Sequence, residues 1–565
     1  MAAAVRMRDF ATWARTVLGP DRSFFSLAIV YGLGVGLLSL ATPISVQMLI
    51  NSVANTALPA PLFTLAAVLF GLLALQGVLS GLRTYVMELF RRRFFARMVA
   101  ETTLRAVHAR NPFFTDARRA DLFNRFFEIM TVQKAMPSLL IGLFTLALQS
   151  AVGFVLTSFY HPVFLAFNLV VVLGLWAIWR LWSRGAMATA VAQSHAKYAA
   201  AHWLASIGAS NGFYNSERRI AFAMKGSEAV TTRYVAEHKR HFHYSFAQTI
   251  AYLGLYAVAS ASLLALGGWL VIQGQLSLGQ LVAAELILSS IFYGISQLGA
   301  YIDIFYDLVA GVEELNLLLE IPQEPHPPMV RTNEPPPTSD LVFRGVRVGP
   351  VRFDLSLPAG ARLAASAGPE VERRFTLLLK RHLKPELGFV ALGGVDLASL
   401  DVYRLRTEVV VLDRPMIVEG GIRDFLRLAA PSAPEARSLE VLRAVGLERA
   451  VARLPDGLDT VLASTGWPLA TAEMMRLRLA GAILASPRVL VLAPLFDMIP
   501  SAELTEMLRT LDAATTLICF TSRPEALDLG RWLHLGHRRQ SIVADPAELA
   551  RLCALEEEVD DALPV

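Results

Sequence analysis

Long runs of apolar residues dominate the N-terminal part of the chain. Between Ser23 and Leu82 there is no Asp, Glu, Lys or Arg. A helix needs about 20 apolar residues to cross a hydrocarbon core about 30 Å thick, so this run is long enough for two spans. The same criterion predicts six spans in total, at Phe24–Met48, Pro61–Val86, Pro137–Phe159, Val163–Leu181, Phe246–Ile272 and Leu278–Phe305.

The pattern changes twice after the last span. Residues 321–340 contain seven prolines, which favour an extended linker because proline cannot continue a helix. Beyond it, short apolar runs alternate with helical stretches, and this alternation predicts the buried parallel strands of an α/β domain. The runs are RLAASA (Arg362–Ala367), EVVVL (Glu408–Leu412), VLVLA (Val489–Ala493) and TTLICFTS (Thr515–Ser522).

These patterns divide the chain into four parts. Residues 1–320 form a six-span membrane domain whose two long polar connections, helix-rich and poor in Gly and Pro, extend the spans as helical rods into the cytosol. The linker, residues 321–340, leads to the α/β domain, residues 341–550. Residues 551–565 are an acidic tail that we expect to be solvated and disordered.

Composition and charge give the orientation in the membrane. The chain is 54% hydrophobic and 18% charged. Residues 83–134 hold eleven Lys or Arg against five Asp or Glu, and residues 180–240 hold nine against three. Because cytoplasmic connections carry the excess of Lys and Arg, both termini and the C-terminal domain are expected in the cytoplasm, with the spans in the lipid bilayer of a bacterial inner membrane.

Several classes of site are not indicated by the sequence. No aromatic-rich basic module accompanies the Lys and Arg residues, so no nucleic acid is expected as a partner. The two cysteines, Cys519 and Cys553, fall in the cytosolic part, where thiols stay reduced. No metal site is expected.

The order of these parts resembles a half-transporter of the ABC exporter family. NPFFTDARRADLFNR (Asn111–Arg125) is similar to the first cytoplasmic coupling segment of that family, and residues 267–288 are similar to its hairpin between spans five and six. In the C-terminal domain, GGVDLASLDVYRLR (Gly393–Arg406) and GLERAVARLPDGLDT (Gly446–Thr460) match the nucleotide-binding domain of the family. The resemblance implies a P-loop-NTPase-like (ABC) α/β domain after the six-span membrane domain.

The phosphate-binding loop departs from the family pattern. A P-loop reads G-x-x-x-x-G-K-[ST], because backbone N–H groups and a lysine surround the phosphates and a hydroxyl binds magnesium. Gly368 holds the first position, whereas Arg373 replaces the second glycine, Arg374 the lysine, and Phe375 with Thr376 the hydroxyl pair. Gly368, Arg374 and Thr376 are the vestigial nucleotide-binding positions. We expect Phe375 to be packed and both arginines to be solvated.

The other family motifs depart in the same way. Ala493 and Pro494 stand where a magnesium-supporting Asp and a water-orienting Glu are needed for hydrolysis. Ser522 stands at the switch histidine and Asp413 at the Q-loop glutamine, while Asp497 reads as a surface turn residue. The family signature LSGGQ aligns with LATAE, which is Leu469, Ala470, Thr471, Ala472 and Glu473.

These departures predict a pseudo-ATPase domain with no catalytic residue and no bound cofactor. The resemblance implies that ATP and Mg²⁺ bind to a partner subunit, so a heterodimer with an ATP-competent half-transporter is expected rather than a homodimer. Export of an unknown substrate, a peptide or a protein if a membrane-fusion protein accompanies the system, is the first hypothesis. A non-transporting membrane scaffold or regulatory pseudo-transporter is the second, and an ATPase that uses unconventional residues is the third.

Overall fold

The computed structural model describes residues 7–56, 60–110, 121–324, 334–415 and 417–560. The chain divides into two compact units, Met1–Pro325 and His326–Val565. Each unit has hydrophobic clusters of its own.

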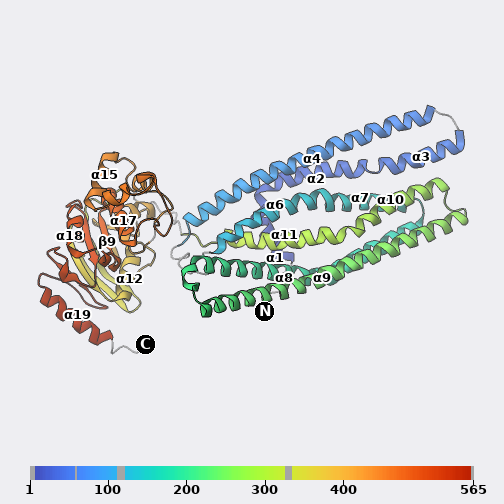
Figure 1. The fold of residues 1–565 in the computed structure, drawn as a ribbon. Coiled ribbons are helices and arrows are strands. Elements are labelled where there is room, and N and C mark those ends of the chain that lie inside the picture. The colour runs from blue at the N-terminus through green and yellow to red at the C-terminus, as the bar shows by residue number, and fades with distance from the viewer. Residues whose placement is uncertain (1–6, 57–59, 111–120, 325–333, 416, 561–565) are drawn as a thin grey trace. The chain divides into compact units, whose positions relative to one another are not determined.

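The N-terminal unit consists of long helices (Figure 1). Among the residues that the structure describes, six helical stretches of this unit are long and apolar enough to cross a membrane, as the sequence predicted. Its helices are α1 (Met7–Leu18), α2 (Arg22–Leu38), α3 (Ala41–Thr56), α4 (Ala60–Val107), α6 (Glu128–Ser138), α7 (Phe144–Ser158), α8 (Pro162–Ala209), α9 (Glu217–Ile272), α10 (Leu278–Ser296) and α11 (Leu298–Leu319), with short helical turns η1 (Gly19–Asp21), η3 (Asp121–Phe127), η4 (Leu139–Leu143) and η5 (Asn211–Tyr214).

The expected helical extensions are present in this unit. Helix α4 continues well past Val86, the predicted end of the second span, and α8 and α9 continue through the polar connection between spans four and five. Helices α8 and α9 lie side by side along much of their length (Figure 1). The turn between α9 and α10 is closed by a capping box, in which the Ser277 hydroxyl accepts from the Gln280 N–H at 3.1 Å and the Gln280 side chain accepts from the Ser277 N–H at 2.9 Å. Of the predicted coupling segment, residues 111–120 lie outside the described residues.

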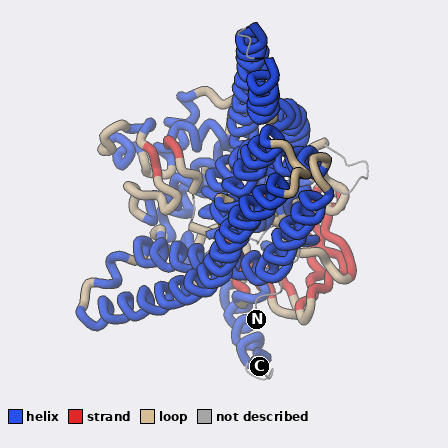
Figure 2. The backbone as a smooth tube through the Cα atoms, turned by 90° about the vertical axis from the view of Figure 1, so that its right-hand side faces the viewer, coloured by secondary structure: helices blue, strands red, loops and turns tan. Residues whose placement is uncertain are grey.

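The C-terminal unit contains two main sheets, and Figure 2 colours its strands red. One is antiparallel, in the order β2-β1-β4-β5, and the other has the order β12-β11-β3-β10-β9-β6. In the second sheet β11, β3, β10, β9 and β6 are parallel and β12 is antiparallel to β11. The strands are β1 (Leu341–Val348), β2 (Val351–Leu357), β3 (Arg362–Ala367), β4 (Leu387–Leu392), β5 (Val395–Asp396), β6 (Val409–Leu412), β9 (Val489–Leu492), β10 (Thr516–Phe520), β11 (Trp532–Leu535) and β12 (Gln540–Val543), with a small ribbon of β7 (Gly420–Gly421) and β8 (Val461–Leu462).

Helices cover both faces of the parallel sheet. Helix α12 (Pro369–Leu379) shares one hydrophobic cluster with the antiparallel sheet, and α17 (Thr471–Ala485) belongs to the cluster on the other face. All four predicted strands, β3, β6, β9 and β10, are present and parallel. The remaining helical elements are α13 (Val402–Glu408), α14 (Ile422–Ala429), α15 (Glu435–Ala444), α16 (Glu448–Ala452), η6 (Gly457–Asp459), η7 (Pro494–Met498), α18 (Ser501–Arg509), η8 (Pro524–Ala526) and α19 (Pro546–Asp560).

The acidic tail differs from the prediction. It was expected to be disordered from residue 551, but helix α19 continues through Asp560. Proline at the first helical position and Glu548 in the first turn favour this helix, because proline needs no N–H partner there and a negative charge is stabilised at a helix N-terminus.

Candidate functional site

The register of the parallel sheet brings four of the predicted positions to one edge. Ala365 pairs with Phe520, Cys519 with Leu492, and Leu492 with Leu412. The carboxyl ends of β3, β10, β9 and β6 therefore end at similar heights. The residues that follow these strands, Gly368, Ser522, Ala493 and Asp413, stand at the edge where ligands bind in open α/β sheets.

The segment after β3 is a helix where a P-loop would be an open loop. β3 ends at Ala367, Gly368 is the N-cap with extended backbone angles (φ −62°, ψ 150°), and α12 begins at Pro369. Pro369 has no N–H to donate to a phosphate. Glu370 and Glu372 occupy the first turn of α12, and their carboxylates disfavour the binding of a phosphate there.

Phe375 fills the core beneath this helix. Its side chain is fully buried, and its ring stacks on Phe343 with a centroid separation of 4.9 Å. Phe353 and Phe520 contact the same ring in edge-to-face geometry, at 5.7 and 5.9 Å. The expectation that Phe375 packs is therefore confirmed.

The two arginines differ from each other. Arg373 is exposed, as expected. Arg374 is only partly solvated, because its Nε donates to Glu370 Oε1 at 3.0 Å and its Nη1 to the Val348 carbonyl at 2.9 Å. This guanidinium lowers the pKa of the Glu370 carboxyl below its ordinary value. Arg374, which stands at the lysine position of the P-loop pattern, is therefore held by a carboxylate of its own helix.

Thr376 also has an internal partner. Its hydroxyl is buried and donates to the Arg373 carbonyl at 3.0 Å, one turn earlier in α12. This is the common backbonding of a helical threonine. The hydroxyl proton is therefore used within α12.

Asp497 connects the ends of β9 and β10. Ala493 follows β9, and η7 carries Asp497 to Ser522, whose N–H and hydroxyl donate to Asp497 Oδ2 at 2.8 and 2.7 Å. Asp497 was expected to be a surface turn residue; it lies in a turn, but it is half-buried and has a definite partner. The Asp497–Ser522 contact was not predicted, because the two residues belong to different loops.

Asp413 forms an ion pair at the end of β6. Its Oδ2 lies 2.5 Å from Nζ of Lys380, which follows the last turn of α12. Burial lowers the pKa of Lys380, and Asp413 acts in the opposite direction. The position of the Q-loop glutamine is therefore occupied by a carboxylate that balances a half-buried lysine.

The LATAE segment forms the start of α17. Ala470 is the N-cap and has no side-chain acceptor, but Glu473 Oε2 accepts from the Ala470 N–H at 2.9 Å. Leu469 is buried, whereas Ala470 and Thr471 are exposed and Ala472 is half-buried. Glu473 therefore satisfies an N–H at the start of α17 with a carboxylate of the same helix.

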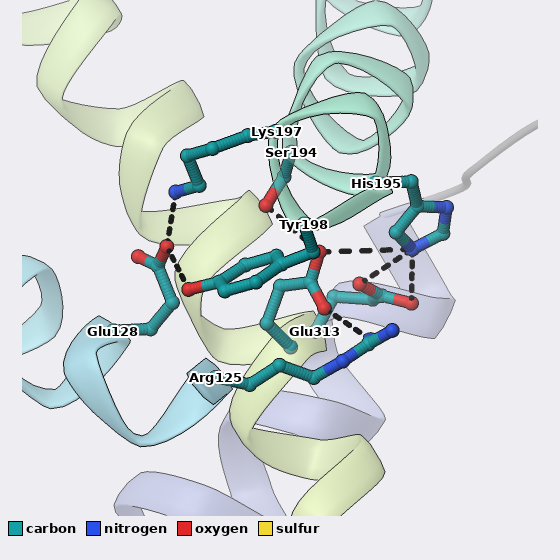
Figure 3. Close-up of polar contacts among 8 residues, drawn as sticks. Arg125, Glu128, Ser194, His195, Lys197, Tyr198 and Glu313 are labelled. Atoms are coloured by element: carbon teal, nitrogen blue, oxygen red, sulfur yellow. Dashed lines mark hydrogen bonds and ion pairs between the residues drawn. The ribbon is translucent and has the colours of Figure 1, made fainter. Parts of the chain in front are cut away.

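A second polar site lies in the N-terminal unit (Figure 3). Glu128 of α6 accepts from Tyr198 at 2.7 Å and forms an ion pair with Lys197, both from α8. Glu314 of α11 forms an ion pair with Arg125 of η3 and accepts from the Ser194 hydroxyl at 2.8 Å. We call the eight residues of this site the polar cluster: Arg125, Glu128, Ser194, His195, Lys197, Tyr198, Glu313 and Glu314.

The polar cluster was not predicted from the sequence. Its members come from three separate stretches of the chain, and Glu313 and Glu314 are two adjacent acids near the C-terminal end of α11. Glu313 is 8% exposed and Glu314 is fully buried. Two adjacent acids flanked on both sides by apolar residues are the signal that could have indicated it, since buried carboxylates are paired or bind metals.

Comparison with known proteins finds similarity to ABC transporters. Residues 25–206 match the family model of the ABC transporter transmembrane region. The leukotoxin translocation ATP-binding proteins LktB of Mannheimia haemolytica and Bibersteinia trehalosi are each 23% identical over 511 residues, covering 87% of this chain and 70% of the relative. A bacterial Atm1-family ABC exporter with ATP bound superposes with a TM-score of 0.75 at 18% identity, covering 96% of this chain and 99% of that chain.

The two units agree with these comparisons. In the described part of the N-terminal unit there are six apolar helices of spanning length, and the C-terminal unit has a parallel sheet with helices on both faces. The chain is therefore an integral membrane protein with the fold and domain order of an ABC exporter half-transporter.

Proposed function

We propose that this chain is a transport subunit of an ABC exporter whose own C-terminal domain neither binds ATP tightly nor hydrolyses it. An ATP-competent half-transporter provides the ATPase cycle in a heterodimer. The observation that carries this proposal is the start of α12 at Pro369, directly after the N-cap Gly368. A helix in this position leaves no loop of N–H groups to surround phosphates.

The neighbouring residues support the same function. Arg374 is held by Glu370, Thr376 by its own helix, and Phe375 by the core. Ala493 and Pro494 at the end of β9 offer no carboxylate for magnesium or for the attacking water. Phosphoryl transfer depends on positioning and charge stabilisation by such groups, so their joint loss removes catalysis rather than tuning it.

Nucleotide binding by the purified full-length chain in nanodiscs tests the proposal. A fluorescent ATP analogue should show no saturable binding in the micromolar range, and phosphate release with Mg²⁺ should equal the protein-free rate. An ATP-competent exporter measured in parallel is the positive control. Micromolar binding, or hydrolysis that requires Mg²⁺, would show that the domain works with unconventional residues. Arg374→Ala then reports whether the vestigial cation is involved.

The heterodimer part of the proposal rests on two segments that together form an ATP site, the phosphate-binding loop of one domain and the signature segment of the other. In a homodimer of this chain, both domains would have α12 beginning at Pro369 and LATAE in place of the signature. Neither ATP site of the homodimer would then have a phosphate-binding loop. Crosslinking in native membranes followed by mass spectrometry should recover a second half-transporter with an intact G-x-x-x-x-G-K-[ST] motif. The reconstituted pair should hydrolyse ATP, and a partner with its motif lysine substituted should not.

A membrane scaffold or regulator is the alternative that this experiment separates. The LktB relatives are named for leukotoxin translocation, which supports a peptide or protein as substrate, with a membrane-fusion protein as a further partner. If the reconstituted pair hydrolyses ATP but accumulates no substrate in inverted vesicles, the chain is a regulator.

We also propose that the chain lies in a bacterial inner membrane with both termini on the cytoplasmic side. A fluorescent C-terminal GFP fusion would support this orientation, and an active C-terminal alkaline phosphatase fusion would contradict it.

A further inference from the structure

We propose that His195, Glu313 and Glu314 form a binding site for one divalent transition-metal ion such as Zn²⁺. Each of the three residues offers one ligand atom, and these atoms all lie within 4.8 Å of one another. Histidine nitrogen and carboxylate oxygen are ligands that Zn²⁺ accepts, and three protein ligands with one open position are a common zinc arrangement.

The distances are close to those that a metal would impose. His195 Nε2 lies 3.1 and 3.2 Å from the two carboxylate oxygens of Glu313 and 3.9 Å from Glu314 Oε1 (Figure 3). Two ligands about 2.1 Å from a tetrahedral ion are about 3.4 Å apart. Side-chain shifts of about 1 Å or less would therefore suffice, without movement of α8 or α11.

The groups behind the ligands orient them. Glu314 uses its two oxygens separately: Oε2 pairs with Arg125, whereas Oε1 accepts from the Ser194 hydroxyl at 2.8 Å and faces His195. Such partners fix a ligating carboxylate and contribute strongly to metal affinity. The pairing with Arg125 leaves the oxygen that faces His195 available as a ligand.

The charges of the polar cluster favour a cation at this place. Glu128, Glu313 and Glu314 are three carboxylates, and Arg125 and Lys197 are the permanent cations paired with two of them. Glu313 is 8% exposed, and its partner within the cluster is a histidine that carries no charge when neutral. A buried carboxylate needs a compensating charge, and a metal ion on the His195 side would supply it.

Access and topology also fit a bound ion. The His195 side chain is 44% exposed, so an ion can enter from the side of α8. His195 lies on α8 and both acids on α11, so the ion would join two helices that already pack together. We expect it to stabilise this contact and slow the separation of α8 from α11.

Zinc titration of the full-length chain in metal-free buffer tests the site. Competition with a chromophoric chelator should give one Zn²⁺ per chain, and Co²⁺ in its place should give the visible absorption of a four-coordinate ion. His195→Asn and Glu313→Gln should weaken binding at least about tenfold. His202→Asn, a histidine seven residues further along the same helix, is the matched control and should leave the affinity unchanged.

Two outcomes would overturn the proposal. One is the absence of stoichiometric Zn²⁺ or Co²⁺ binding, which would leave the polar cluster as a hydrogen-bonded charge network only. The other is equal affinity in the wild type and in His195→Asn, which would place the ion elsewhere. Size-exclusion profiles and thermal unfolding of the variants without metal establish that they are folded, and Glu314 is left intact because its loss would also leave Arg125 unpaired.

Discussion

Cys519 and Cys553 show how differently two side chains of one type are placed in the C-terminal unit. Cys519 lies in β10 and is fully buried, and this burial raises the pKa of its thiol to about 12. Cys553 lies in α19, is only half-buried, and has Ser366 and His534 as neighbours at 3.4 and 3.8 Å. The sequence predicted that both cysteines stay free thiols. Their different burial indicates that Cys553 is the more reactive of the two.

Native labelling with a maleimide at neutral pH should therefore modify Cys553 and leave Cys519 unmodified. Cys519 should react only when the unit unfolds, because burial shields its sulfur from the reagent and the raised pKa keeps it in the unreactive thiol form. Mass spectrometry of peptides labelled with and without urea measures this. Modification of Cys519 as fast as that of Cys553 in native protein would contradict the burial of β10. With Cys553→Ser as background, Cys519 then becomes a probe of unfolding.

Phe375→Ala should lower the free energy of unfolding of the C-terminal unit by about 3–5 kcal/mol, because it deletes a fully buried ring and leaves a cavity among Phe343, Phe353 and Phe520. The urea midpoint of Cys519 labelling measures the loss. Arg373→Ala, two residues earlier on the exposed side of α12, is the control and should change the free energy by about 0.5 kcal/mol or less.

At the scale of elements, strands were easier to predict than helix starts. β9 is buried at all four of its positions, so its apolar run indicated a central strand directly. The P-loop pattern does not give the start of α12, which lies at Pro369 directly after Gly368. Pro369 at the first helical position and acids in the first turn are ordinary helix-start signals, and they describe the local structure better than the motif does.

The link between η7 and the end of β10 gives a second stability prediction. Asp497→Ala removes the acceptor of two hydrogen bonds from Ser522, whereas Ser522→Ala removes only the one from its hydroxyl. Asp497→Ala should therefore cost about 1–3 kcal/mol, and Ser522→Ala should cost less, about 0.5–1.5 kcal/mol. The urea midpoint of Cys519 labelling ranks the stabilities of the two variants. An equal or reversed ranking would show that the Asp497–Ser522 contact does not hold η7 to the end of β10.

At the scale of the whole molecule, hydropathy predicted the membrane-crossing helices well. Backbone groups in lipid must be paired internally, so a long apolar run has little alternative to a helix. Contacts between helices could not be predicted, because nearly uniform apolar segments do not fix helix rotation. His195 and Glu313 belong to helices that lie far apart in the sequence, and only the fold brings them together.

The C-terminal unit should fold without the membrane domain. Among the described residues, its two hydrophobic clusters draw only on positions from Leu341 onward. A fragment of residues 334–565 should be soluble and should unfold in urea in one cooperative transition, with Cys519 protected before it. Aggregation or a broad transition would indicate that the N-terminal unit supplies part of its core.

The burial of Phe375 has a consequence for the history of this chain. Restoring the motif would require Gly, Lys and Ser at Arg373, Arg374 and Phe375, and the last change would remove the ring that joins the antiparallel sheet to the parallel one. The change at Phe375 would thus weaken the domain before any nucleotide could compensate. Selection acting one substitution at a time would oppose that return, because the loss of the ring would come before any gain from nucleotide binding.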